Sequence, residues 1–202
     1  MDETTVSKQD FFVIAIGCSA GGTAAYNELF SRLPIDMNAA FIIIQHLHPD
    51  FVSTNHQLLT EYTSMKTFSA KDGQIVVPGC VYFLPENAMM AILNRTLQIR
   101  PRRKDEIINR AVDIFFTSLA DDLKEKGIGV ILSGYGKDGS EGAIQMHKCG
   151  GTVIVQSPRS ALYKGMPQSS IEYDNPDYIL DPDELAARLM ELTGYPSERK
   201  LL

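Results

Sequence analysis

Three polar residues with complementary chemistry each follow a short apolar run of the sequence. Ser19 comes after the first such run, 11–16, His46 follows the second, and Asp138 lies in the glycine-dense loop 133–139 after a third. A serine hydroxyl is a poor nucleophile until a base takes its proton, and histidine does this near neutral pH. A carboxylate then fixes the histidine tautomer and stabilises its charged form. These residue types predict a Ser-His-Asp hydrolase.

The elements that would position them alternate between strands and helices. Apolar, β-branched runs are typical of parallel strands buried on both faces, and helical spacing of apolar residues fills the segments between them. The predicted strands are 11–16, 41–44, 129–132, 152–155 and 179–180, and the predicted helices are 23–33, 53–62, 109–126, 140–148 and 183–193. This alternation predicts an α/β fold with a doubly wound, mostly parallel open sheet of the Rossmann type. Ligands of such sheets bind beyond the carboxyl ends of the strands, where all three residues fall.

The middle of the chain has a different pattern. Short apolar segments at 80–84, 89–93 and 97–100 are separated by the turn signals 85–87 and 94–95. Tight connections between short strands indicate antiparallel pairing. We therefore expect an antiparallel hairpin or meander inserted into the alternating chain.

The turn that carries Ser19 has three interpretations. Gly17-Cys18-Ser19-Ala20-Gly21 matches the G-x-S-x-G elbow, which holds a serine at a helix N-terminus, where free backbone N–H groups stabilise an oxyanion. Alternatively, the turn cradles a phosphate, or Ser19 is only a helix N-cap. The spacing of this turn is not the dinucleotide pattern G-x-G-x-x-G, and no convincing acidic ribose ligand follows the second strand. The nucleophile is the favoured interpretation.

The residues alone do not decide which histidine is the base and which aspartate is the orienting acid. His48 lies two residues from His46 in the same loop, and position favours His46 only modestly. His56 and His147 fall in predicted helices. The rivals of Asp138 as the acid are Asp36, Asp50 and Asp72.

Composition narrows the functional class. The 202-residue chain is 44% hydrophobic with a formal net charge of −6, which argues against nucleic-acid binding. The one basic cluster, 100–104, is short and precedes two acidic residues, so we expect a solvated loop. Three distant cysteines indicate reduced thiols rather than a metal site. A polar N-terminus and short apolar runs predict a cytoplasmic protein without a signal peptide or membrane insertion.

The expected domain organisation is simple. Residues 1–10 are predicted to be a disordered lead-in, residues 11–195 a single catalytic domain, and residues 196–202 a tail.

Several motifs in order resemble the catalytic domain of the chemotaxis protein-glutamate methylesterases, the CheB family. The resemblance covers about Val13 to Glu191, and each motif alone is modest, but their order and spacing are specific. The motifs are Ile14-Ala15-Ile16-Gly17-Cys18-Ser19-Ala20-Gly21-Gly22, Gln45-His46-Leu47-His48-Pro49-Asp50-Phe51, Asp72-Gly73, Pro78-Gly79-Cys80-Val81-Tyr82, Pro85, Val112-Asp113-Ile114-Phe115-Phe116, Leu132-Ser133-Gly134-Tyr135-Gly136-Lys137-Asp138-Gly139 and Gly165-Met166-Pro167.

The resemblance assigns roles to the candidate residues. By matching position, Ser19 is the nucleophile, His46 the base and Asp138 the orienting acid, and the motif Gln45-His46 selects His46 over His48. The implied oxyanion and substrate cleft is formed by Ala20, Gly21, Tyr135, Gly136 and Met166. No metal or organic cofactor is implied.

The implied activity is hydrolysis of glutamate methyl esters on the cytoplasmic helices of chemoreceptors, with deamidation of receptor glutamines as a second reaction. The family also implies a receiver or methyltransferase domain as a neighbour in a parent protein. Ala20 and Tyr135 depart from the residues usual in the family, which favours mildly the alternative of a non-catalytic receptor-docking domain.

Overall fold

The structure, a computed structural model, describes residues 10–46 and 54–196, and within these ranges seven strands form one parallel sheet. The strand order is β3-β4-β2-β1-β7-β8-β9. These strands are β1 (Phe12–Cys18), β2 (Ala39–Gln45), β3 (Lys66–Ser69), β4 (Cys80–Phe83), β7 (Gly127–Ile131), β8 (Thr152–Gln156) and β9 (Tyr178–Leu180). The predicted doubly wound α/β fold is confirmed. The expected ends of the chain, a disordered lead-in and a tail, lie almost wholly outside the described residues.

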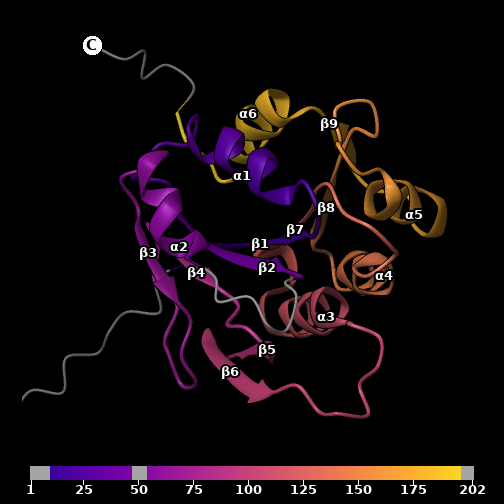
Figure 1. The fold of residues 1–202 in the computed structure, drawn as a ribbon. Helices are drawn as coiled ribbons and strands as arrows, with labels where there is room; N and C mark the ends of the chain where they lie inside the picture. The colour runs from indigo at the N-terminus through magenta and orange to yellow at the C-terminus, as the bar shows by residue number, and fades with distance from the viewer. Residues whose placement is uncertain (1–9, 47–53, 197–202) are drawn as a thin grey trace, which may run out of the picture.

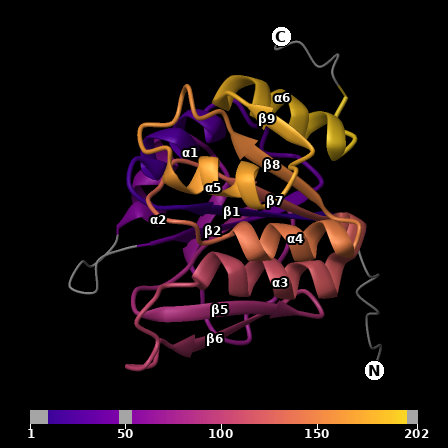
Figure 2. The ribbon, with the colours of Figure 1, turned by 90° about the vertical axis from the view of Figure 1, so that its right-hand side faces the viewer.

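Helices cover both faces of the sheet (Figures 1 and 2), because its central strands are apolar on both sides. The helices are α1 (Gly22–Phe30), α2 (Asn55–Leu58), α3 (Ala111–Leu123), α4 (Ser140–Lys148), α5 (Gly165–Tyr173) and α6 (Pro182–Leu192), with 3-10 turns at Leu59–Glu61 and Lys124–Lys126. Ile14 and Ile16 of β1 belong to the core beneath α1 and α6, whereas Val13 and Ala15 belong to the core beneath α3 and α4.

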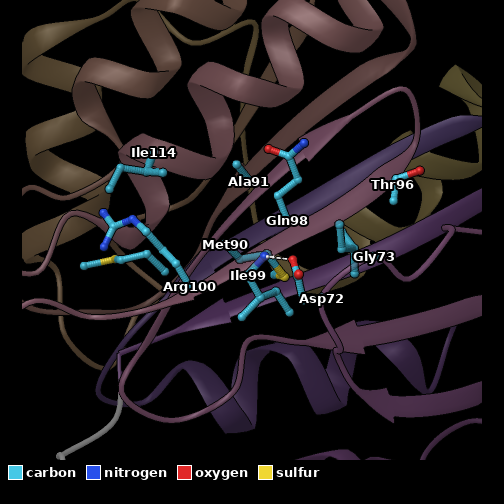
Figure 3. A pocket seen from close by; sticks show the side chains of 11 residues that line it. Asp72, Gly73, Met90, Ala91, Thr96, Gln98, Ile99, Arg100 and Ile114 are labelled. Carbon is cyan, nitrogen blue, oxygen red and sulfur yellow. Dashed lines mark hydrogen bonds between the residues drawn. The ribbon is translucent and has the colours of Figure 1, made fainter.

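A separate antiparallel hairpin lies beyond α3, on the side away from the sheet (Figure 2). Its strands are β5 (Ala88–Leu93) and β6 (Thr96–Pro101). A cavity of about 560 Å³ lies against this hairpin, and Figure 3 shows side chains that line it. Asp72 Oδ1 accepts a hydrogen bond there from the backbone N–H of Ile99, at 2.8 Å. The expectation of an inserted hairpin is confirmed for these two strands.

Three elements differ from the sequence prediction. Segment 80–84 was expected in the hairpin or meander, but β4 joins the main sheet in parallel with β2, and all four of its residues are buried. Strand β3 was not predicted because only one of its four residues, Phe68, is apolar, so the sequence has neither an apolar run nor an alternating pattern there. Helix α5 was not predicted because Gly165 and Pro167 are turn signals, although proline is tolerated in the first helical turn.

Candidate active site

The site is located by the topology around β1. This strand pairs with β2 on one side and β7 on the other, so the strand order reverses there, where open α/β sheets bind ligands. Ser19 directly follows β1, His46 directly follows β2, and Asp138 lies in the loop between β7 and α4. The sheet therefore brings the three predicted residues to one edge.

The backbone of Ser19 packs against the loop that follows β7. Ser19 N–H donates to the carbonyl of Ser133 at 3.0 Å, and Gly21 takes φ +74° to begin α1. A Cβ at Gly134 would lie 3.0 Å from both Ser19 Cβ and Ser19 N, and 2.3 Å from Met166 Sδ. Only glycine fits there, and its absence of a side chain allows the two loops to touch.

Both the backbone and the side chain of His46 are hydrogen-bonded at the same edge of the sheet. Its backbone N–H donates to the carbonyl of Cys18 at 3.0 Å, which fixes it beside the end of β1. Its Nε2 lies 2.6 Å from Oδ2 of Asp138, and the two side chains are 17% and 5% exposed. A hydrogen bond from Nε2 to the carboxylate leaves Nδ1 as the ring nitrogen with a free lone pair.

The Ser19 hydroxyl is less constrained than the histidine. Within residues 10–46 and 54–196 it makes no hydrogen bond, so the contact with the imidazole through which a histidine takes the proton of a serine nucleophile is absent there. Catalytic hydrogen bonds are often long before substrate binds, and this geometry leaves Ser19 as a candidate.

Asp138 is held by the start of α3. Its Oδ2 accepts the backbone N–H of Val112 and its Oδ1 that of Asp113, both at 2.9 Å. Helix N-termini stabilise negative charge, and two amide donors fix the plane of the carboxylate. The start of α3 therefore fixes the Asp138 carboxylate beside His46 Nε2.

A cavity of about 440 Å³ opens beside the imidazole. Of the predicted residues, His46, Tyr135, Gly136 and Asp138 line it, and Tyr135 is 64% exposed at its rim. The predicted residues that do not line this cavity are Ser19, Ala20, Gly21 and Met166. Ala20 instead accepts the Ser133 hydroxyl at 2.9 Å, and Met166 is fully buried.

The alternative acids and bases that the structure describes make their contacts away from Ser19. Asp36 accepts the hydroxyl of Tyr195 at 2.9 Å, Asp72 belongs to the hairpin region, and the ring of His56 packs against Phe83. The remaining rivals, His48 and Asp50, lie outside the described residues.

Sequence reasoning gave no chemical role to three residues that build the site. Asp113 and Ser133 stood in quoted motifs only, and Gly134 was part of a glycine-dense loop. Ser133 connects three segments, because its hydroxyl donates to Ala20 O and accepts Tyr163 N–H, both at 2.9 Å, while its carbonyl accepts Ser19 N–H. The burial of Ser133, at 1% exposure, is visible only in three dimensions.

The described part of the chain has neither a metal-binding cluster nor a membrane-spanning helix. It holds no group of three or more His, Cys, Asp or Glu side chains arranged to bind a metal ion. It also contains no helix with the length and apolar character needed to cross a membrane.

Known proteins resemble this chain in both sequence and fold. The family model of CheB methylesterase matches residues 14–189. The chain belongs to the CheB methylesterase family. The crystal structure of the Thermotoga maritima CheB methylesterase catalytic domain is similar, with a TM-score of 0.83 and 32% identity, over 90% of this chain and 98% of that one. The predicted family and fold are confirmed.

Curated CheB relatives are longer than this chain. A Thermotoga maritima protein-glutamate methylesterase/protein-glutamine glutaminase is 33% identical over 89% of this chain and 54% of its own length. A Pseudomonas aeruginosa relative of the same description is 31% identical over 89% of this chain and 54% of its own length. A third relative, from Methanospirillum hungatei, is 32% identical over 96% of this chain and 55% of its own length. The chain thus spans about half the length of the curated relatives that it matches.

Proposed function

We propose that this chain hydrolyses γ-methyl esters of glutamate side chains on chemoreceptors, with Ser19 as nucleophile, His46 as general base and Asp138 as orienting acid. The observation that carries the proposal is the 2.6 Å hydrogen bond between His46 Nε2 and Asp138 Oδ2, beside the turn of Ser19. Membership of the CheB methylesterase family supports the ester as substrate. The descriptions of the relatives support glutamine deamidation as a second reaction.

In the first half of the reaction, Ser19 Oγ attacks the ester carbonyl carbon while His46 Nδ1 takes the hydroxyl proton. Asp138 stabilises the resulting imidazolium through Nε2. The tetrahedral intermediate collapses, the C–O bond to the methoxy group breaks, and His46 returns the proton so that methanol leaves. The product is an acyl ester between Ser19 Oγ and the receptor glutamate.

In the second half, His46 Nδ1 takes a proton from water, whose oxygen attacks the acyl carbon. Collapse breaks the bond to Ser19 Oγ, which regains the proton, and a glutamate carboxylate is released. For a glutamine side chain, ammonia leaves in place of methanol.

The developing oxyanion needs hydrogen-bond donors close to Ser19. Tyr135 and Gly136 support this role, because within the described ranges their backbone N–H groups make no hydrogen bond and both residues line the cavity beside His46. The N-terminus of α1, two residues beyond Ala20, adds its positive end.

The rim of the cavity fits a protein substrate. Ile108, Tyr135 and Tyr173 line the cavity and are 75%, 64% and 57% exposed, respectively. Exposed apolar groups gathered at one site are typical of surfaces that a partner covers. We assign the cytoplasmic helices of methylated receptors to this surface and therefore a cytoplasmic location to the chain.

The test is methanol release from a receptor cytoplasmic fragment whose glutamates carry labelled methyl esters. Wild type releases methanol, and Ser19→Ala loses on the order of 10⁶-fold in kcat, the size expected for a missing serine nucleophile. Ser31→Ala is the matched control. Ser31 lies just beyond the end of α1 that is far from Ser19, and its hydroxyl donates to the carbonyl of Glu28. Equal release by wild type and Ser19→Ala removes Ser19 from the mechanism. Binding of the fragment without any release would support a docking domain.

A further inference from the structure

Helices α3 and α4 lie side by side (Figure 2), and each is capped by a carboxylate from the start of the other. Their own N-cap residues, Arg110 and Gly139, provide no side-chain cap. Asp138, just before α4, accepts the N–H groups of Val112 and Asp113 at the start of α3. In return, Asp113 Oδ1 accepts the N–H groups of Gly139 and Gly142 at the start of α4, both at 2.9 Å.

We propose that Asp113 is a positioning residue that holds Asp138 in place for His46 through this reciprocal exchange of helix caps. The inference rests on the proposed function, in which Asp138 orients the base. Asp113 binds the N–H of Gly139, the residue directly after Asp138, so its carboxylate fixes the backbone from which the Asp138 side chain extends. Asp113 N–H donates to the same carboxylate, so one residue determines both the backbone and the side chain of Asp138.

The packing around this exchange leaves little freedom. A Cβ at Gly142 would lie 2.6 Å from Phe116 Cβ and 3.1 Å from Asp113 Cα, so α3 and α4 approach closely at this level. Asp113 and Asp138 are each 7% exposed. Loss of the Asp113 carboxylate would leave two buried N–H groups of α4 without their acceptor, and the loop before α4 would have to move to reach water.

The groups around Asp113 and Asp138 affect the charges of the two carboxyls. Burial raises the pKa of the Asp113 carboxyl, and the neighbouring Asp138 raises it further, whereas the N–H groups of Gly142 and Gly139 lower it. Arg110 Nε lies 3.5 Å from Asp113 Oδ2, and Arg110 also pairs with Glu141 of α4. His46 faces the pair from the end of β2. Two helix N-termini and one arginine therefore lie against the two buried carboxyl groups, and the net effect on Asp113 is still a raised pKa.

The experiment compares Asp113→Ala with Asp113→Asn in the methanol-release assay. The alanine removes the acceptor of Gly139 and Gly142, and we expect kcat to fall on the order of 100-fold, as for a catalytic group displaced by about 1 Å, with KM unchanged within about twofold. The asparagine retains an acceptor oxygen and should keep kcat within about fivefold of wild type. Rescue by the asparagine identifies the hydrogen bonds of Asp113 as the cause.

Asp181→Ala is the matched control for a lost helix cap. Asp181 and Glu184 form a capping box at the start of α6, outside the cavity beside His46. This variant should lose stability, about 1 kcal/mol for a cap, but keep the wild-type kcat. Wild-type kcat in Asp113→Ala, or an equal fall in kcat in Asp181→Ala, overturns the proposal. If Asp113→Ala does not fold, Asp113→Asn decides: a loss of kcat as large as that of Asp138→Asn overturns it.

A second measurement separates this inference from the proposed function. Proton NMR detects the imidazole N–H that His46 donates to Asp138 as a downfield signal, whether or not the chain hydrolyses esters. We expect the signal in wild type and Asp113→Asn and its loss or shift in Asp113→Ala. If wild type releases no methanol but the signal behaves in this way, the proposed function fails and the positioning role stands. An unchanged signal in Asp113→Ala contradicts the positioning role alone.

Discussion

His46 Nε2 lies 2.6 Å from Asp138 Oδ2, so the nitrogen far from the histidine backbone is the one that faces the acid. In the serine-protease arrangement the acid contacts Nδ1 and the serine contacts Nε2. In the proposed mechanism the roles of the two nitrogens are exchanged, because the contact of Nε2 with Asp138 leaves Nδ1 to act on Ser19. The exchange follows from the fold, because His46 is bonded through its backbone to the end of β1 while Asp138 lies in the loop before α4.

The first prediction concerns Asp138→Asn. The carboxylate accepts three hydrogen bonds, from His46, Val112 and Asp113, and an amide must turn its NH₂ group toward at least one of these donors. If NH₂ faces His46, it favours the tautomer with the proton on Nδ1, which cannot take a proton from Ser19. We expect kcat to fall about 10⁴-fold, as for this change in a Ser-His-Asp triad. Steady-state methanol release measures it.

Asp72→Asn is the control for Asp138→Asn. Asp72 also accepts a backbone N–H, that of Ile99, but it lies at the hairpin. Its substitution should leave kcat unchanged. If both variants are slowed equally, or if Asp138→Asn keeps the wild-type rate, Asp138 does not orient the base.

The second prediction concerns Gly134→Ala. The added Cβ would meet Met166 Sδ at 2.3 Å and the backbone N of Ser19 at 3.0 Å. The methionine side chain can move, but the Ser19 backbone is bonded to Ser133 and must be displaced with its turn. We expect kcat to fall on the order of 100-fold while the chain still folds. Methanol release measures the fall in kcat, and circular dichroism shows whether the chain still folds.

The double variant Gly134→Ala/Met166→Ala identifies the responsible contact. It removes the clash with Met166 and leaves the one with Ser19. Activity should stay low in the double variant. Recovery to the wild-type rate would show that the methionine, and not the serine turn, had been displaced.

Much of this fold follows from local sequence patterns. Buried runs such as 11–16 and 41–44 predict parallel strands because a sheet covered on both faces accepts apolar residues at every position. Strand β4 satisfies the same rule, but its neighbours in sequence are turns, and its parallel pairing with β2 depends on contacts distant along the chain. Pairing partners of short strands are determined by tertiary packing, which local periodicity does not report.

The site was predictable in part, because the strands that carry it could be recognised from local sequence patterns. The ends of β1 and β2 place Ser19 and His46 at one edge, and the resemblance to a family then selects Asp138. The proposed role of Asp113 was not predictable, because the groups that it bonds lie in α4 and in the loop before α4, distant along the chain. Nor does the sequence indicate which imidazole nitrogen faces the acid, since this depends on the direction from which the loop before α4 arrives.

The last prediction concerns the stability of the chain through His147. Its Nδ1 lies 2.8 Å from Asp174 Oδ2 and its Nε2 2.9 Å from Asp177 Oδ2. Burial lowers the pKa of the imidazole, but the hydrogen bonds and charges of Asp177 and Asp174 outweigh this effect, and the pKa is raised in the folded chain. The stabilisation is thus fully present below the unfolded pKa of about 6.5 and is lost as pH rises through the higher folded value.

We therefore expect His147→Gln to reduce the free energy of unfolding more at about pH 5.5 than at about pH 9, since only the protonated imidazole benefits from both carboxylates. Urea unfolding of wild type and variant at both pH values measures the difference. His56→Gln is the control, because His56 pairs with no carboxylate among the described residues, and its effect should change less with pH. A destabilisation by His147→Gln of the same size at both pH values would mean that the charge of His147 does not contribute to holding α4 against the segment before β9.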